Sequence, residues 1–225
     1  MKVIMHWKYG AARKPNAVFT SDWMDAQDAL TIIDDLEKAG RMKEVEVSDE
    51  LGTTWSKKEL RKLLAKVEEE PQDATVFFDG GYQKNSKLSG LGVVIYYRQG
   101  KEQWRVRINR LLQELDTNNE AEYAAFYEAV KQLEELGVHH QSVVFKGDSQ
   151  VVLNQLSGEW ACFEDVLNQW LDRIERKLKQ LGIIPVFEPI GRKDNTEADK
   201  LATQALNGEE ISSKFNLTAN SRETE

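Results

Sequence analysis

The chain has 225 residues, 40% of them hydrophobic and 30% charged, and a formal net charge of −8. This composition excludes a disordered chain, a collagen and a coiled coil, and the negative charge disfavours a protein that coats nucleic acid nonspecifically. The sequence shows no apolar run of the roughly 18 residues that a membrane span needs, no signal-peptide pattern and a single cysteine, Cys162, so we expect a cytoplasmic protein without a membrane partner.

Residues 1–70 predict a small α+β module with the order strand, strand, helix, strand, helix. Two apolar runs, 3–7 and 17–20, flank a polar connection and suggest a hairpin. Apolar residues at helical spacing follow over 26–36, and a capping box at 56–59 opens a second helix. A unit this short buries little surface by itself, so we expect it to lean on a neighbour.

The stretch Glu68–Asp73 predicts a domain boundary, because it is acidic and a helix does not run comfortably through Pro71. A larger domain over residues 74–207 follows this boundary. Residues 208–225 are polar and aperiodic, and we expect them to form a flexible tail.

The larger domain predicts an α/β fold. Its apolar patterns predict the element order βββαβααβα, which indicates a mixed sheet covered by helices. Gly80-Gly81 and Gln99-Gly100 are among its turn signals. The expected strands cover 75–78, 91–97, 103–108, 142–145 and 185–190, and the expected helices cover 119–136, 149–156, 165–181 and 196–206.

Two acids follow apolar strands of this domain. Asp79 comes after 76–78, and Asp148 follows 143–145 at the start of a helix. Each has an ordinary alternative role, since Asp79 suits a turn and Asp148 suits a helix cap. Strand ends of one sheet lie side by side, however, so the pair also fits a ligand site.

Two further acids lie at the starts of helices. Thr117 and Glu120 form a capping box that opens the long helix, whereas Glu122 begins the apolar stripe of that helix. A buried carboxylate there needs a cation or a proton. Asp199 lies in the first turn of the last helix, where capping is the alternative role.

The four acids together predict a metal site. Hard oxygen ligands without a nearby histidine or cysteine favour Mg²⁺ or Mn²⁺. Such a cluster can hold two cations roughly 4 Å apart, an arrangement that suits in-line attack on a phosphodiester.

Four motifs in the segment 75–206 resemble those of type 1 ribonuclease H, including its bacterial reverse-transcriptase-like relatives. The resemblance implies a ribonuclease H-like five-stranded mixed sheet flanked by helices. It further implies endonucleolytic hydrolysis of the RNA strand of RNA–DNA hybrids, leaving 5′-phosphate and 3′-hydroxyl ends, with Asp79, Glu122, Asp148 and Asp199 as the acids that bind two Mg²⁺ or Mn²⁺ ions. The matching motifs are Phe78-Asp79-Gly80-Gly81, Thr117-Asn118-Asn119-Glu120-Ala121-Glu122, Gly147-Asp148-Ser149-Gln150 and Asn195-Thr196-Glu197-Ala198-Asp199-Lys200-Leu201-Ala202.

The resemblance also implies contacts with the hybrid. Asn118, Asn119 and Gln150 would reach the minor groove and the ribose 2′-hydroxyl groups, which distinguish RNA from DNA. Thr117 and Asn85 would meet a phosphate of the DNA strand. The alternative role of Thr117, Asn118 and Asn119 is helix capping. The full set of predicted substrate-binding residues is Gly80, Asn85, Thr117, Asn118, Asn119, Gln150 and Arg192.

The sequence departs from the family pattern in two places. The loop 191–195 carries Arg192 where the family usually has a histidine, and 157–164 is short and acidic where some members have a basic protrusion. We therefore consider the N-terminal module as a substrate-binding or homodimerising unit, with a solvated surface and core tryptophans as the alternative. Its candidate phosphate and stacking contacts are Lys8, Arg13, Lys14, Lys57, Lys58, Arg61, Lys62, Trp7, Trp23 and Trp55.

Two other functions stay open at this point. One is a noncatalytic nucleic-acid-binding protein that keeps the fold, and the other is a metal-dependent exonuclease. The four acids favour an enzyme, and the altered loop and the missing protrusion keep the binding protein open as an alternative. The three histidines, His6, His139 and His140, lie in the first strand and in a turn far along the chain from the loop 191–195, and we interpret them as structural or solvated.

Overall fold

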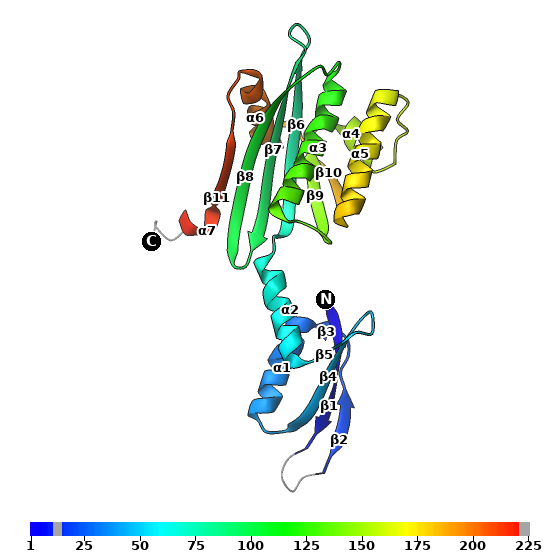
Figure 1. Cartoon of the computed structure of the whole chain (residues 1–225), viewed down its shortest axis with the longest axis vertical. Helices are drawn as coiled ribbons and strands as arrows, with labels where there is room; N and C mark the ends of the chain where they lie inside the picture. Colours follow the sequence, from blue (N-terminus) through cyan, green and yellow to red (C-terminus); the bar gives the residue numbers. More distant parts are fainter. Residues whose placement is uncertain (11–14, 221–225) are drawn as a thin grey trace. The chain divides into compact units, whose positions relative to one another are not determined.

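The computed structural model describes residues 1–10 and 15–220. It divides the chain into two compact units, Met1–Glu69 and Glu70–Glu225 (Figure 1). The division falls within the acidic stretch that precedes Pro71, where the last helix of the first unit ends at Glu69. Among the described residues, no helix is long and apolar enough to cross a membrane.

The first unit is an antiparallel sheet with two helices packed on one face. The strand order is β2-β1-β4-β5, and β3 pairs with β1. Its core includes Met5, Ile33, Val47 and Leu60, which come from both helices and from the two central strands. Its elements are β1 (Lys2–Tyr9), β2 (Ala17–Thr20), β3 (Met24–Asp25), α1 (Ala26–Lys38), β4 (Met42–Asp49), β5 (Thr54–Trp55) and α2 (Lys57–Glu69).

Several side chains of this unit that were predicted to contact nucleic acid instead have partners within the unit. Lys57 forms ion pairs with Asp34 and Glu37, and Arg61 pairs with the same Asp34 carboxylate at 2.8 Å. The remaining nominated side chains divide into those that have partners, those at the surface and those outside the described residues. Trp55 donates its indole N–H to Asp49 at 2.9 Å, Trp7 stacks on Phe19 with ring centroids 5.3 Å apart, Trp23 is exposed, and Arg13 and Lys14 lie outside the described residues.

The second unit contains the predicted mixed sheet. Its order is β10-β9-β6-β7-β8-β11, with β6, β7 and β8 antiparallel and with β9 and β10 parallel to each other and to β6. Its elements are β6 (Gln72–Gln83), β7 (Leu88–Gln99), β8 (Glu102–Gln113), α3 (Asn118–Leu136), β9 (Ser142–Gly147), α4 (Gln150–Leu156), α5 (Asp165–Leu181), β10 (Ile184–Pro189), η1 (Arg192–Asp194), α6 (Thr196–Leu206), β11 (Ser212–Asn216) and α7 (Leu217–Asn220).

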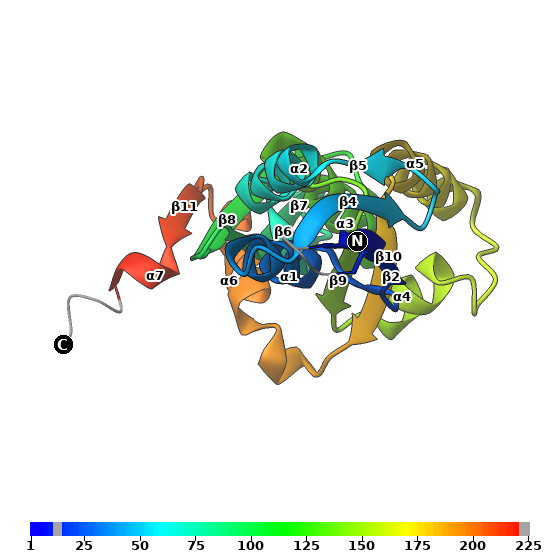
Figure 2. The same cartoon turned by 90° about the horizontal axis from the view of Figure 1, so that it is seen from below.

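Helices cover both faces of this sheet (Figure 2). The main core lies on the side of α3 and α5 and includes Phe78, Val93 and Phe126. A smaller cluster lies on the opposite side, where Ala198 and Leu201 of α6 pack against Val94. The predicted mixed α/β fold with flanking helices is therefore confirmed.

The expectation of a flexible tail over 208–225 is wrong for residues 212–216. These residues form β11, which pairs antiparallel with β8 and adds a sixth strand to the predicted five. The buried side chain of Asn109 holds the connection, because its amide donates to the Glu209 carbonyl at 2.8 Å and accepts from the Ile211 N–H at 2.7 Å. The edge of β8 offers backbone donors and acceptors that a polar segment satisfies as well as an apolar one.

Candidate metal centre

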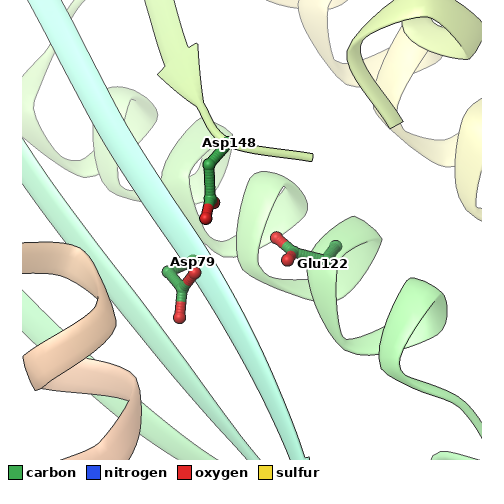
Figure 3. Close-up of side chains that lie close together, drawn as sticks. All are labelled: Asp79, Glu122 and Asp148. Carbon is green, nitrogen blue, oxygen red and sulfur yellow. The ribbon is translucent and has the colours of Figure 1, made fainter. Parts of the chain in front are cut away.

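Three of the four predicted acids converge. One carboxylate oxygen from each of Asp79, Glu122 and Asp148 lies within 4.8 Å of the others, and Figure 3 shows the three side chains pointing into a common space. Asp79 and Glu122 are only 9% and 7% exposed. Asp79 belongs to β6, Glu122 belongs to α3, and Asp148 directly follows β9, so three separate segments build the cluster.

Asp79 lies inside a strand and not at its end. We expected Gly80-Gly81 to mark a turn, but β6 continues to Gln83. The reason is tertiary, since a Cβ on Gly80 would overlap with the backbone of Ala121 and Glu122. Glycine at this position therefore allows the first turn of α3 to rest directly on β6, which brings Glu122 beside Asp79.

The start of α3 is held by the predicted capping box. Thr117 caps the helix, and its hydroxyl accepts from the Glu120 N–H at 3.1 Å. Glu120 in turn accepts from the backbone N–H of Asp116 at 2.9 Å and from the indole N–H of Trp170 at 3.2 Å. The structural role expected for Glu120 is thus observed, and the capped first turn directs Glu122 inward.

In the absence of a cation, the surroundings of the cluster disfavour the ionised forms of Asp79 and Glu122. Burial, and then the charges of Asp148 and Asp199, raise the pKa of Asp79 to about 7. Burial, and then the charges of Asp79 and Asp148, raise the pKa of Glu122 to about 9, although a hydrogen bond from the Gly80 N–H opposes this shift. Glu122 Oε2 is buried and has no hydrogen-bond partner among the described residues. A buried oxygen without a partner beside two other carboxylates fits a hard divalent cation such as Mg²⁺ or Mn²⁺.

Asp148 does not cap α4, because the capping position belongs to Ser149. Its carboxylate instead accepts a hydrogen bond from the amide of Asn195 at 3.2 Å. Asp199 is not one of the three converging acids. It lies in the first turn of α6, where its carboxylate is 3.5 Å from the guanidinium of Arg192 and close enough to raise the pKa of Asp79.

The helix that carries Asp199 rests directly on the sheet. A Cβ on Gly90 or Gly92 of β7 would overlap with the backbone of α6, so glycine permits this contact. Glu197, next to Asp199 in sequence, accepts from the hydroxyl of Tyr96 at 2.9 Å. The same carboxylate pairs with Arg105 and Arg107 of β8 at 3.3 and 3.1 Å. These contacts hold the start of α6 against the sheet.

The predicted substrate-binding residues occupy different settings in the structure. Gly80 is buried against α3, and its position is explained by that packing contact. Thr117 acts as a helix cap. The others are at or near the surface: Asn85 in the turn between β6 and β7, Asn118 and Asn119 at the start of α3, Gln150 at the start of α4, and Arg192, whose side chain is 83% exposed.

One residue that contacts the cluster, Asn195, was not predicted from the sequence. The only available signal was its place in the motif that contains Asp199, three residues after Arg192. Its side chain is buried and bonds both to Asp148 and to the backbone of Phe78, which only the tertiary structure brings together.

Comparisons with known proteins agree with this architecture. Residues 77–205 match the reverse transcriptase-like family. The chain is 46% identical over 221 residues to an uncharacterized protein of Bacillus subtilis strain 168, YpeP, and the match covers 98% of this chain and 97% of that relative.

Two solved structures resemble the second unit. The RNase H1 of the halophilic archaeon Halobacterium salinarum NRC-1 is 27% identical with a TM-score of 0.53, and the match covers 60% of this chain and 98% of that one. LC11-RNase H1, crystallised with an RNA/DNA hybrid, is 27% identical with a TM-score of 0.55 and the same coverage. The resemblance inferred from the motifs is confirmed, and the chain belongs to the reverse transcriptase-like family of proteins with the ribonuclease H fold.

Proposed function

We propose that the protein is a metal-dependent endonuclease that hydrolyses the RNA strand of RNA–DNA hybrids. The convergence of Asp79, Glu122 and Asp148 around a buried, unpartnered carboxylate oxygen carries this proposal. The likeness to LC11-RNase H1, which was crystallised with an RNA/DNA hybrid, supports the choice of substrate.

The acids hold the cations in this proposal. Asp79, Glu122 and Asp148 supply the central ligands, and Asp199 contributes from the side of α6. Two Mg²⁺ or Mn²⁺ ions held by these acids would supply the activation of a water and the stabilisation of the leaving 3′ oxygen, so that cleavage would leave 5′-phosphate and 3′-hydroxyl ends. Asp79 and Glu122 have raised pKa values, so their protons must leave when the site is loaded.

Polar side chains near the acids orient the hybrid. Asn118, Asn119 and Gln150 lie at the starts of α3 and α4, the two elements that begin next to the acids. Their amides suit the 2′-hydroxyl groups of the minor groove, which mark the RNA strand. The guanidinium of Arg192 is available to a phosphate once Asp199 binds a cation, because the present ion pair is long and exposed.

The first unit keeps the proposed role of a substrate-binding or homodimerising module. Lys57, Arg61 and Trp55 are excluded from the proposed contact surface because they have partners within the unit. Lys58, Lys62 and Trp23 remain as its candidate contacts, whereas Lys8 pairs with Glu44 at 3.9 Å and Trp7 stacks on Phe19.

A cleavage assay tests the proposed function. A labelled RNA–DNA hybrid is incubated with the full chain in Mg²⁺, in Mn²⁺ and in EDTA, with single-stranded RNA, duplex RNA and duplex DNA as controls. We expect internal cuts in the RNA strand of the hybrid that need the cation and disappear in Asp148→Asn. Asp172→Asn, at an exposed position of α5, is the matched control and should cleave like the wild type.

Each alternative function gives a different result in this assay. A ladder that grows from one end of the strand indicates an exonuclease. Binding of the hybrid without cleavage in either cation indicates a noncatalytic binding protein and refutes the proposed reaction.

A further inference from the structure

Asn195 links two of the strands that carry the acids. Its side chain is 1% exposed and lies at the N-terminal end of α6. The amide nitrogen donates to the Phe78 carbonyl at 2.9 Å and to Asp148 Oδ1 at 3.2 Å. Phe78 is the residue before Asp79. The Asn195 amide therefore contacts both the Phe78–Asp79 peptide and the Asp148 carboxylate.

The chemistry of these partners requires an amide. The Phe78 carbonyl and the Asp148 carboxylate have only lone pairs to offer, so the side chain between them must donate twice. The amino group of asparagine supplies two N–H donors on a short side chain, whereas an ionised aspartate in the same place would offer both acceptors no donor. The orientation of the amide is therefore determined by its partners.

The amide oxygen of Asn195 lowers the stability of the fold. Asn195 Oδ1 is buried and has no hydrogen-bond partner among the residues that the structure describes. A buried acceptor without a partner destabilises the fold, because it has lost its hydrogen bonds to water. Asn195 is therefore held in place by the two hydrogen bonds that its amide nitrogen donates, to Phe78 and to Asp148.

Asn195 lies on a segment that is packed tightly against the sheet. It belongs to the start of α6, which the glycines of β7 and the ion pairs of Glu197 hold against the sheet. Its carbonyl also accepts the backbone N–H of Asp199 at 3.1 Å. The residue therefore relates the positions of Asp79, Asp148 and Asp199 to one another.

We propose that Asn195 is a positioning residue of the metal centre. Its amide holds the Asp148 carboxylate and the Phe78–Asp79 peptide in the arrangement in which Asp79, Glu122 and Asp148 converge. It acts through Asp148 and not on the substrate. This inference rests on the proposed function, because the positioning has a consequence only if the acids bind a divalent cation.

Asn109 offers a matched control. It is also a buried asparagine, 2% exposed, and its amide donates to the carbonyls of Leu201 and Glu209 at 3.1 and 2.8 Å. Asn109 thus connects β8 with α6 and the segment that follows it. Both of its acceptors are backbone carbonyls, and neither is an acid of the cluster. Replacing either asparagine by alanine removes two donated hydrogen bonds from the interior, and at Asn109 it also removes the hydrogen bond accepted from the Ile211 N–H.

The test is Mn²⁺ binding to the full chain without substrate, measured by calorimetry and by electron paramagnetic resonance. Both Asn195→Ala and Asn109→Ala should lower the melting temperature. Loss of a residue that orients a metal ligand weakens metal affinity by about 10–100-fold, so we expect this loss in Asn195→Ala and a change of less than about threefold in Asn109→Ala. In hybrid cleavage, Asn195→Ala should lower kcat and leave KM unchanged.

A folded Asn195→Ala protein that binds Mn²⁺ within about threefold of the wild type overturns the inference. If that variant does not fold, Asn195→Ser keeps one hydroxyl donor, and wild-type Mn²⁺ affinity in it has the same meaning. A wild-type chain that binds Mn²⁺ and cleaves the hybrid while both variants match it refutes the positioning role alone. A wild-type chain that binds no Mn²⁺ refutes the proposed function and this inference with it.

Discussion

The buried carboxyl of Glu122 leads to a quantitative prediction about the metal-free protein. Its pKa is raised from 4.5 to about 9, first by burial and then by the charges of Asp79 and Asp148. Between these values the folded protein holds a proton that the unfolded chain has released. The stability that the protonated acid contributes is complete below pH 4.5 and is lost as the pH rises to about 9.

The magnitude follows from the size of the shift. One pKa unit corresponds to about 1.4 kcal/mol, so between about pH 5 and about pH 8 Glu122 lowers the free energy of unfolding by up to about 4 kcal/mol. Glu122→Gln keeps the shape of the side chain and cannot ionise. In EDTA the stability advantage of the variant over the wild type should therefore grow by up to about 4 kcal/mol over this pH range, at a steady ~1.4 kcal/mol per pH unit.

Urea unfolding followed by circular dichroism in EDTA, at several pH values, measures this difference. Glu135→Gln, an exposed position on the same helix, is the control and should follow the wild-type curve. Addition of Mg²⁺ at about pH 8 should restore stability to the wild type and much less to Glu122→Gln, because the cation replaces the displaced proton. If the curves of the wild type and Glu122→Gln stay parallel within about 1 kcal/mol, the buried-acid reasoning is refuted.

Three further predictions concern the acids, the substrate contacts and the first unit. Asp148→Asn should keep or raise the melting temperature in EDTA while it weakens Mg²⁺ binding, because its charge raises the pKa of both Asp79 and Glu122; a marked fall in melting temperature would contradict this. The double substitution Asn118→Ala and Asn119→Ala should reduce the preference for hybrid over duplex DNA in binding assays, after correction for lost helix capping. An unchanged preference in a folded protein would show that these residues do not contact the minor groove. A shortened chain beginning at Gln72 should bind hybrids more weakly and with a shallower salt dependence, whereas an unchanged salt slope excludes the first unit from phosphate contact and a change from dimer to monomer indicates assembly.

The sequence predicted the elements that apolar periodicity and capping define. The long helix α3 begins at its capping box and ends at Gly137, because the signals that start and stop a helix are local. Strand lengths were underestimated, since β6 runs through Gly80 and Gly81. Glycine in a turn and glycine under a helix look alike in sequence, and only the contact with α3 distinguishes them.

The four acids were proposed from the sequence because each occupies a motif of the family, and Glu122 also because a carboxylate at the start of an apolar stripe has no structural use; three of the four converge in the structure. Their distances and protonation were decided by tertiary structure. The raised pKa values of Asp79 and Glu122 come from burial and from neighbours that lie on other elements. The same holds for Asn195, whose partners lie 117 and 47 residues away in sequence, and for β11, which is ordered by the free edge of β8 and by Asn109. Local sequence therefore determined which side chains have the required chemistry, whereas the packing of α3 and α6 on the sheet decided which of them meet, because a long-range contact depends on the whole chain and leaves no periodic signal in any one segment.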